Sequence, residues 1–143
     1  MCVVIKVQDA VTAGFFSCTE IYTGHTIMNS MYEFPPNGTM QDLSRGPMIV
    51  YVNVGWCGHC KHTKPIMEKV ARTLGSMVPV ISVDGDKCKS VTTQLGAKGF
   101  PTIMYIDESG KRFQYTGDRS VDAISSFVCH NSSDRHAFCK RMN

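Results

Sequence analysis

The chain has 143 residues, of which 43% are hydrophobic and 19% charged, a balance typical of one soluble globular domain with its own core. The formal net charge is +3 with acidic and basic residues interleaved, which is too little to indicate nucleic acid or an anionic membrane surface as a partner. No apolar run approaches the roughly 20 residues of a membrane helix, and we see no leader peptide or retention motif. We therefore expect no membrane association and a cytoplasmic or other non-secretory compartment.

The first part of the chain has scattered signals of secondary structure. Apolar runs over residues 3–5 and 26–34 predict strands. Residues 35–38 have the composition of a turn, and residues 40–44 predict a short helix.

A stronger pattern begins at residue 48. The β-branched, almost wholly apolar run over 48–54 predicts a central strand that is covered on both faces. A helix over 57–74 is expected to follow and to end near Gly75. Pro65 lies inside that helix, and we expect it to kink there because proline offers no backbone N–H.

The second half of the chain alternates strands and helices. The expected elements are strands over 78–83, 102–106 and 112–116, with the last at a sheet edge, and helices over 86–95 and 120–128. This order predicts a mixed sheet with helices on both faces.

Cys57 and Cys60 are separated by two residues at the expected start of a helix. This spacing places them one turn apart on one helix face, next to unpaired N–H groups and the positive end of the helix dipole. A thiol in such a place is stabilised as the reactive thiolate. The competing interpretation is half of a zinc site with His59 and His62, but no second pair of cysteines lies at zinc-finger spacing.

Four segments of the sequence occur in a familiar order. Residues 56–61 read Trp-Cys-Gly-His-Cys-Lys, Pro65 follows on the same helix, residues 99–103 read Gly-Phe-Pro-Thr-Ile, and residues 115–119 read Tyr-Thr-Gly-Asp-Arg. Together they resemble the thioredoxin superfamily, and within it the CGHC catalytic domains of protein disulfide isomerases. The matched features are the isomerase active site, the kink of its helix, the cis-proline loop and the segment of the mobile arginine.

The resemblance implies an α/β thioredoxin fold, with a mixed central sheet flanked by helices. We expect an N-terminal extension over residues 1–25, the thioredoxin-like domain over 26–128 and a short polar C-terminal tail over 129–143.

The resemblance also assigns roles to individual residues. The residues implied in catalysis are Cys57, Gly58, His59, Cys60 and Arg119, and those implied in substrate binding are Trp56, Phe100 and Pro101. Cys57 would attack and form a mixed disulfide, and Cys60 would resolve it. His59 would stabilise the thiolate, which makes the disulfide easier to donate than that of thioredoxin. Each assignment has an ordinary alternative: Trp56 as a core aromatic, Pro101 as a strand-start residue and Arg119 as a solvated side chain.

Two positions depart from the family pattern. Tyr51 stands where the resemblance places a buried acid that takes the proton from the resolving thiol, and Ser82 stands where it places the partner lysine. A phenol, with an ordinary pKa of about 10, is a poor base near neutral pH. A tyrosine–serine pair needs only hydrogen bonds, so Tyr51 is either a core residue or the cause of slow proton removal from Cys60, through water and Arg119.

The chain has seven cysteines, and five lie outside the CxxC pair. Cys129 and Cys139 are expected as a disulfide or as free thiols, in preference to a metal site with His130 and His136. The remaining cysteines, which stay open for an intermolecular bridge, are Cys2, Cys18 and Cys88. A homodimer through the N-terminal region also stays open.

The leading functional interpretation is a thiol–disulfide oxidoreductase of isomerase type without a bound cofactor or metal. Its expected substrates are protein thiols and disulfides, with glutathione or a reductase as an electron partner. One alternative is a redox-fold binding or assembly module, packaged in a particle or complex, with slow or vestigial turnover. The other is a thioredoxin-like cytosolic reductant.

Overall fold

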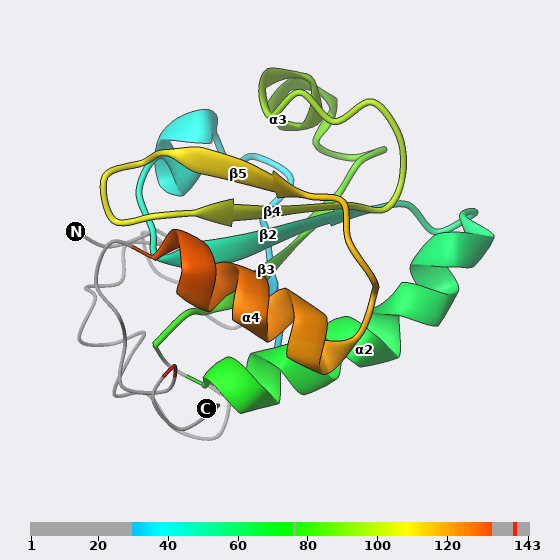
Figure 1. The fold of residues 1–143 in the computed structure, drawn as a ribbon. Coiled ribbons are helices and arrows are strands. Elements are labelled where there is room, and N and C mark those ends of the chain that lie inside the picture. The colour runs from blue at the N-terminus through cyan, green and yellow to red at the C-terminus, as the bar shows by residue number, and fades with distance from the viewer. Residues whose placement is uncertain (1–29, 76, 133–138, 140–143) are drawn as a thin grey trace.

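The computed structural model describes residues 30–75, 77–132 and 139. Five strands form one mixed sheet in the order β1-β3-β2-β4-β5. The strands are β1 (Tyr32–Glu33), β2 (Met48–Asn53), β3 (Val80–Asp84), β4 (Thr102–Ile106) and β5 (Arg112–Tyr115). The long helices α2 (Gly58–Leu74) and α4 (Val121–Asn131) lie on one face of the sheet, and the short helix α3 (Lys89–Gln94) lies on the other (Figure 1).

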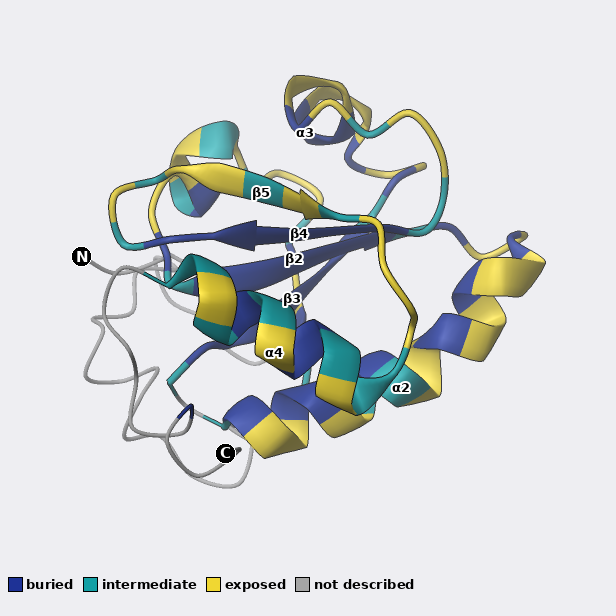
Figure 2. Ribbon diagram, viewed as in Figure 1, coloured by how far each residue is buried: buried dark blue, intermediate teal, exposed yellow. Residues whose placement is uncertain are grey.

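Strand β2 is the centre of the sheet, as its continuous apolar sequence predicts. It pairs in parallel with β3 and in antiparallel with β4, and five of its six residues are buried. Alternate side chains supply two cores on opposite faces. Ile49 and Tyr51 pack toward α2 and α4, whereas Met48, Val50 and Val52 pack toward α3 and the N-terminal part. Figure 2 shows the central strands in the dark blue of buried residues.

Helix α2 is continuous through Pro65 and bends along its length in Figure 1. Its buried side chains face the sheet and α4; they are Cys60, Thr63, Met67, Val70, Ala71 and Leu74. The helix ends at Gly75, where a φ of 60° is a conformation that glycine adopts without steric cost. The sequence-based bounds and the end of this helix are therefore confirmed to within one residue.

Two elements differ from their expected bounds. The strand expected over 78–83 begins two residues later, at Val80, because Pro79 has no N–H for the ladder and offers only its carbonyl, to the N–H of Ile49 at 2.9 Å. The helix expected from residue 86 begins only at Lys89, because the Asp84 carboxylate accepts the N–H groups of residues 86 and 87 and forms a turn.

The elements at the two ends of the domain also differ from their expected bounds. Helix α4 extends to Asn131, three residues beyond the expected 128, and the Asn131 side chain donates to the carbonyl of Phe127 at 2.8 Å. Before β2, the strand expected over 26–34 is present as the two residues of β1, and the short helix is the 3-10 helix η2 (Met40–Leu43). Residues 26–29, the expected strand at 3–5 and the extension over 1–25 lie outside the described residues.

Within the described residues, no helix combines the length and the apolar character needed to cross a membrane.

Candidate active site

The site lies at the sheet edge where β2 and β3 end and β4 begins. Because β2 is parallel to β3 and antiparallel to β4, the loops after the first two strands meet the loop before the third. This topology brings together Trp56 after β2, Asp86 after β3 and Phe100 before β4. The indole N–H of Trp56 donates to Asp86 at 3.0 Å, and its ring meets Phe100 edge-on at 6.0 Å between centroids.

Cys57 is the N-cap of α2. Its backbone is extended, with φ −87° and ψ 118°, and its Sγ accepts the N–H of Cys60 at 3.1 Å. The same sulfur lies 3.6 Å from the carbonyl oxygen of Phe100. The sulfur therefore occupies the place of a capping oxygen, where unpaired helix N–H groups favour a negative charge.

The two thiols of the site differ in acidity. A hydrogen bond from the Cys60 side chain is the largest influence that lowers the pKa of Cys57, and the backbone N–H groups of Cys60 and His59 lower it further. Burial and the hydrogen bond to Cys57 raise the pKa of Cys60 to about 11. The positive charge of Arg119 lowers both values. As pH rises, therefore, Cys57 is the thiol that ionises first, and Cys60 keeps its proton to a higher pH.

The Tyr51 side chain extends from β2 toward the first turn of α2. It is 1% exposed, and its hydroxyl donates to the backbone carbonyl of Cys60 at 2.8 Å. Burial, and then the negative charge of the nearby cysteines, raise the pKa of this phenol far above its ordinary value. The Tyr51 hydroxyl is thus a hydrogen-bond donor held in place by a carbonyl and not a proton acceptor for Cys60.

Ser82 lies beside Tyr51 in the register of β2 and β3, but the two hydroxyls have different partners. Ser82 accepts a hydrogen bond from the amide of Asn53 at 2.9 Å. Each of the two hydroxyls therefore has its own hydrogen-bond partner in place of a charged pair. Asn53, which the sequence did not single out, supplies the donor that a buried serine on this strand needs.

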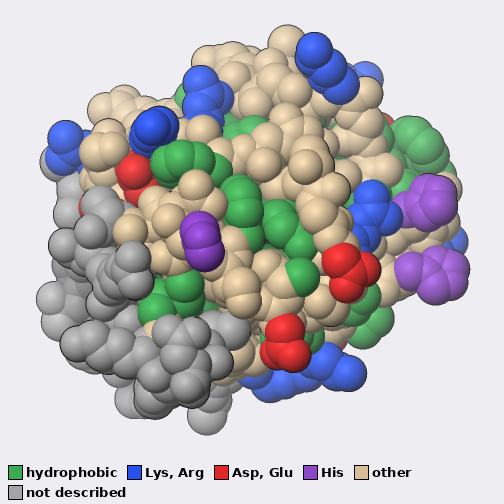
Figure 3. Space-filling view, in the orientation of Figure 1, with side chains coloured by type: hydrophobic (Ala, Val, Ile, Leu, Met, Phe, Trp, Pro, Cys, Tyr) green, Lys and Arg blue, Asp and Glu red, His purple; other side chains and the backbone are tan. Residues whose placement is uncertain are grey.

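His59 and Gly58 form the exposed first turn of α2. The backbone N–H of His59 faces the Cys57 sulfur, while its carbonyl accepts the hydroxyl of Thr63 at 2.7 Å. His62 Nδ1 lies 2.9 Å from the carbonyl of Gly58. Figure 3 shows histidine side chains gathered at the end of the molecule where α2 begins. A Cβ at Gly58 would meet nothing within 4 Å, so steric fit does not demand a glycine there.

Phe100 and Pro101 form the side of the site opposite α2. Both are half-buried, and the peptide bond between them is cis. The Phe100 ring packs with a small buried cluster of Val54, Cys57 and Cys60. Phe100 therefore gives the cysteine pair an apolar neighbour and brings its own carbonyl to the Cys57 sulfur.

Arg119 is exposed and acts on the cysteines through its charge alone in this structure. It lies in the segment between β5 and α4, next to Asp118. The carbonyl of Asp118 accepts the Tyr115 hydroxyl, which fixes the backbone of this segment.

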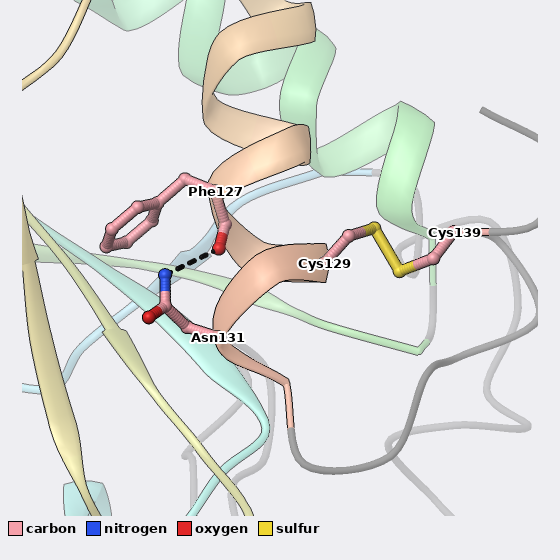
Figure 4. The surroundings of a disulfide bond; sticks show 4 residues. All are labelled: Phe127, Cys129, Asn131 and Cys139. Carbon is pink, nitrogen blue, oxygen red and sulfur yellow. Dashed lines mark hydrogen bonds between the residues drawn. A yellow bond between two sulfur atoms is a disulfide. The ribbon is translucent and has the colours of Figure 1, made fainter. Parts of the chain in front are cut away.

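The other pair of cysteines forms a disulfide at the far end of the molecule. Cys129, near the end of α4, is bonded to Cys139 with 5.6 Å between the Cα atoms, and Figure 4 shows the bridge. Cys139 is buried in the core under α2 and α4. Of the two states expected for this pair, a disulfide or free thiols, the structure has the disulfide. Disulfides of this kind are more typical of oxidising compartments than of the non-secretory compartment expected from sequence.

Sequence reasoning missed two residues of the site in the turn after β3. Asp86 accepts the Trp56 indole, and Gly85 lies where a Cβ would come within 2.6 Å of the Phe100 ring. The dipeptide Asp84-Gly85 is typical of a turn. It does not show which side chains the turn faces, because that depends on the pairing of β2, β3 and β4. Among the described residues, no group of three or more potential metal ligands occurs.

Comparison with known proteins identifies the family and the relatives that this chain resembles. The thioredoxin family model matches residues 37–130, more than half of the chain. "Protein disulfide-isomerase like 2-2" of Arabidopsis thaliana is 39% identical over 85 residues, which are 59% of this chain and 19% of the relative. A mitochondrial thioredoxin domain-containing protein of Schizosaccharomyces pombe is 37% identical over 92 residues, which are 59% of this chain and 25% of the relative. The match therefore spans about a fifth to a quarter of these relatives.

Solved structures show the same fold. The first thioredoxin domain of mouse protein disulfide-isomerase A4 superposes with a TM-score of 0.62 at 24% identity, covering 71% of this chain and 75% of that one. The Trx4 domain of ERdj5 superposes with a TM-score of 0.60 at 18% identity, covering 71% and 94%. The chain belongs to the thioredoxin family, with the thioredoxin fold that the resemblance of its four segments implied.

Proposed function

We propose that the chain is a thiol–disulfide oxidoreductase of the disulfide-isomerase type that exchanges the Cys57–Cys60 pair with the cysteines of other proteins. The observation that carries the proposal is the Cys57 sulfur at the N-cap of α2, where it accepts the N–H of Cys60 at 3.1 Å. A thiolate held in this way is a nucleophile toward disulfides. The isomerase relatives support the same class of reaction.

In the first step, the Cys57 thiolate attacks one sulfur of a substrate disulfide. A bond forms between that sulfur and Cys57 Sγ, the substrate S–S bond breaks, and the other substrate sulfur leaves as a thiolate that takes a proton from water.

In the second step, Cys60 loses its proton and attacks Cys57 Sγ. The Cys57–Cys60 bond forms, the mixed disulfide breaks, and the second substrate sulfur leaves as a thiolate. Two electrons have then passed from the domain to the substrate, and the reverse sequence donates the disulfide of the domain to a substrate dithiol. Glutathione or another dithiol–disulfide couple restores the starting state.

The first step is well supported by the geometry, and the second is the slower one. Cys60 is 3% exposed and the pKa of its thiol is raised to about 11, and the buried Tyr51 hydroxyl donates its hydrogen bond to the Cys60 carbonyl. Among the described residues, no buried carboxylate lies between β2 and α2 to take the proton, so the proton leaves through water, assisted by the charge of Arg119. A long-lived mixed disulfide follows from this arrangement.

The experiment is a pair of assays on the purified chain after equilibration with glutathione: reduction of insulin and refolding of scrambled ribonuclease. The proposal predicts activity in both, loss of both in Cys57→Ser, and an accumulated mixed disulfide with substrate in Cys60→Ser. Inactivity of the unaltered chain in both assays contradicts the proposal.

A second candidate is a binding or assembly module that uses the same fold with slow turnover. The hydrogen bond between Tyr51 and the Cys60 carbonyl favours it, since the described part of the site holds no buried proton acceptor for Cys60. Inactivity in both assays above favours this second candidate, whereas Tyr51→Glu tests whether slow proton removal limits an enzyme. If slow proton removal limits an enzyme, the mixed disulfide is released faster in this variant than in the unaltered chain, and Tyr51→Gln, which offers no base, gives no acceleration. Unchanged release in Tyr51→Glu contradicts the role given to Tyr51.

A further inference from the structure

Two tyrosines lie in one row across the sheet, on the face that α2 and α4 cover. Tyr51 of β2 is in register with Ile103 of β4, and Ile103 is in register with Tyr115 of β5. The Tyr51 hydroxyl donates to a carbonyl in the first turn of α2. The Tyr115 hydroxyl donates to the carbonyl of Asp118, in the segment that runs from the end of β5 to the start of α4 (Figure 1). Each phenol therefore ties a different segment of the site to the sheet.

The Tyr115 side chain is itself held by close contacts. Its ring meets the ring of Phe127 on α4 edge-on, with 4.9 Å between the centroids. The backbone of Gly117 lies so near that a Cβ there would come within 2.7 Å of the Tyr115 hydroxyl oxygen. Burial, and then the charge of Asp118, raise the pKa of this phenol, so the hydroxyl keeps its proton near neutral pH. Tyr115 is therefore a fixed donor to the segment before α4.

Arg119 lies between two anchored points of that segment. Before it, the Asp118 carbonyl accepts the Tyr115 hydroxyl. After it, Ser120 is the N-cap of α4, and its side chain accepts the N–H of Ala123 at 3.2 Å. Because both neighbours of Arg119 are held, its backbone is restricted, and so is the region that its long side chain can reach.

The charge of Arg119 acts on both thiols of the site. The hydrogen bond from Cys60 is the largest influence on the pKa of Cys57, burial is the largest on that of Cys60, and the positive charge of Arg119 lowers both. The interaction between two charges weakens with distance. A movement of the segment that carries Arg119 therefore changes its influence on the two sulfurs.

We propose that Tyr115 is a positioning residue whose hydroxyl holds the segment before α4, so that the Arg119 guanidinium stays close to the cysteine pair throughout the exchange cycle. The proposal rests on the proposed disulfide-exchange function. Tyr115 touches neither sulfur and acts through Arg119 alone. The held charge assists the loss of the Cys60 proton in the second step. This arrangement differs from the mobile arginine that the family resemblance implies.

Tyr115→Phe tests the proposal, because it keeps the aromatic ring and removes only the donor to Asp118. We expect the pH of half-maximal modification of Cys57 by iodoacetamide to rise. We also expect release of a mixed disulfide between Cys57 and glutathione, followed at about pH 7 by mass spectrometry, to slow about threefold, which corresponds to about half a pKa unit in the resolving thiol. Gly117→Ala disturbs the same contact without altering Tyr115, and we expect both readouts to shift in the same direction.

Two controls separate positioning of the charge from general support of the fold. In an Arg119→Gln background, which lacks the charge, Tyr115→Phe is expected to have no further effect on either readout. Tyr32→Phe removes a phenol hydroxyl from β1, whose ring packs in the core on the α3 side, and is expected to change neither readout. Urea unfolding of each variant shows whether the domain remains folded under the assay conditions.

An unchanged pH profile and release rate in Tyr115→Phe contradict the proposal, even where the urea midpoint falls, because the residue then has a structural role only. An equal effect of Tyr115→Phe in the Arg119→Gln background also contradicts it. These outcomes are separate from failure of the proposed function, which shows as inactivity of the unaltered chain toward insulin and scrambled ribonuclease. The alkylation of Cys57 is measured without either protein substrate.

Discussion

The molecule holds two pairs of cysteines that differ in almost every physical respect. Cys57 and Cys60 are free thiols at the first turn of α2, whereas Cys129 and Cys139 form a disulfide at the other end of the two-helix layer (Figures 1 and 4). The first pair is separated by two residues in sequence and the second by nine.

The surroundings of the sulfurs explain the difference. Cys57 Sγ accepts a helix N–H and feels the charge of Arg119, and both influences favour a thiolate. Cys139 instead lies in an apolar core with side chains of α2 and α4 and closes a loop at the end of the domain. A cysteine is thus reactive where backbone N–H groups and charges stabilise its thiolate, and structural where apolar side chains surround it.

The largest expected effect separates the two pairs by activity. Cys57→Ser is expected to abolish disulfide exchange, because a serine hydroxyl does not attack disulfides, while the double variant Cys129→Ser/Cys139→Ser is expected to keep more than about half of it. Reduction of insulin at a temperature where both variants are folded measures this. Equal losses in the two variants would remove the distinction between the pairs.

The next effect is on stability, and here the order of the pairs reverses. Removing the Cys129–Cys139 disulfide, whose partners are 10 positions apart, is expected to lower the free energy of unfolding by about 3 kcal/mol in the chain-entropy account. Urea unfolding of Cys129→Ser/Cys139→Ser against the oxidised parent measures it. Cys57→Ser is the matched control, and a loss as large in that variant would contradict the assignment.

A smaller effect is the pH dependence of thiol reactivity within the first pair. Because the pKa of Cys57 lies below the ordinary thiol value of 9.0 and that of Cys60 is about 11, the reduced pair has two separate titrations. As pH rises, modification by iodoacetamide is expected to increase first at Cys57 and only near pH 11 at Cys60; as pH falls through the pKa of Cys57, its reactivity is lost. Mass spectrometry of the modified peptides assigns the sites, and a shared titration would contradict the split.

The smallest effect concerns Tyr51. Tyr51→Phe removes the donor to the Cys60 carbonyl and is expected to cost about 1 kcal/mol of unfolding free energy, the typical worth of one buried hydrogen bond. Urea unfolding measures it. Because the phenyl ring keeps the packing of the core, a loss of more than about 3 kcal/mol would show that the hydroxyl has a larger structural role.

Much of the fold could be predicted from sequence because its signals are local. The apolar run over 48–54, the CxxC spacing and Gly75 each indicate an element or its end by their own chemistry. The shortened α3 could not be predicted in the same way, since it depends on whether the Asp84 carboxylate caps the turn or points to solvent.

The site was predictable only as far as its residues are adjacent in sequence or fall within motifs. Cys57 and Cys60 share one helix turn, whereas the contact of Trp56 with Asp86 spans 30 residues and exists only after β2 and β3 pair. The hydrogen-bond partner of the Tyr51 hydroxyl likewise could not be predicted, because a strand pattern shows which residue is buried but not which carbonyl it contacts. Long-range polar contacts of this kind follow from topology, not from local pattern.

We expect the Cys57–Cys60 pair to donate its disulfide readily under conditions in which the Cys129–Cys139 disulfide is retained. The most direct test is to equilibrate the chain in glutathione buffers of graded potential and to quantify both pairs by alkylation and mass spectrometry. We expect a midpoint for Cys57–Cys60 near the isomerase value of about −180 mV, with Cys129–Cys139 still oxidised below about −300 mV. A midpoint for Cys57–Cys60 at or below the thioredoxin value of about −270 mV, or joint reduction of the two pairs, would contradict it.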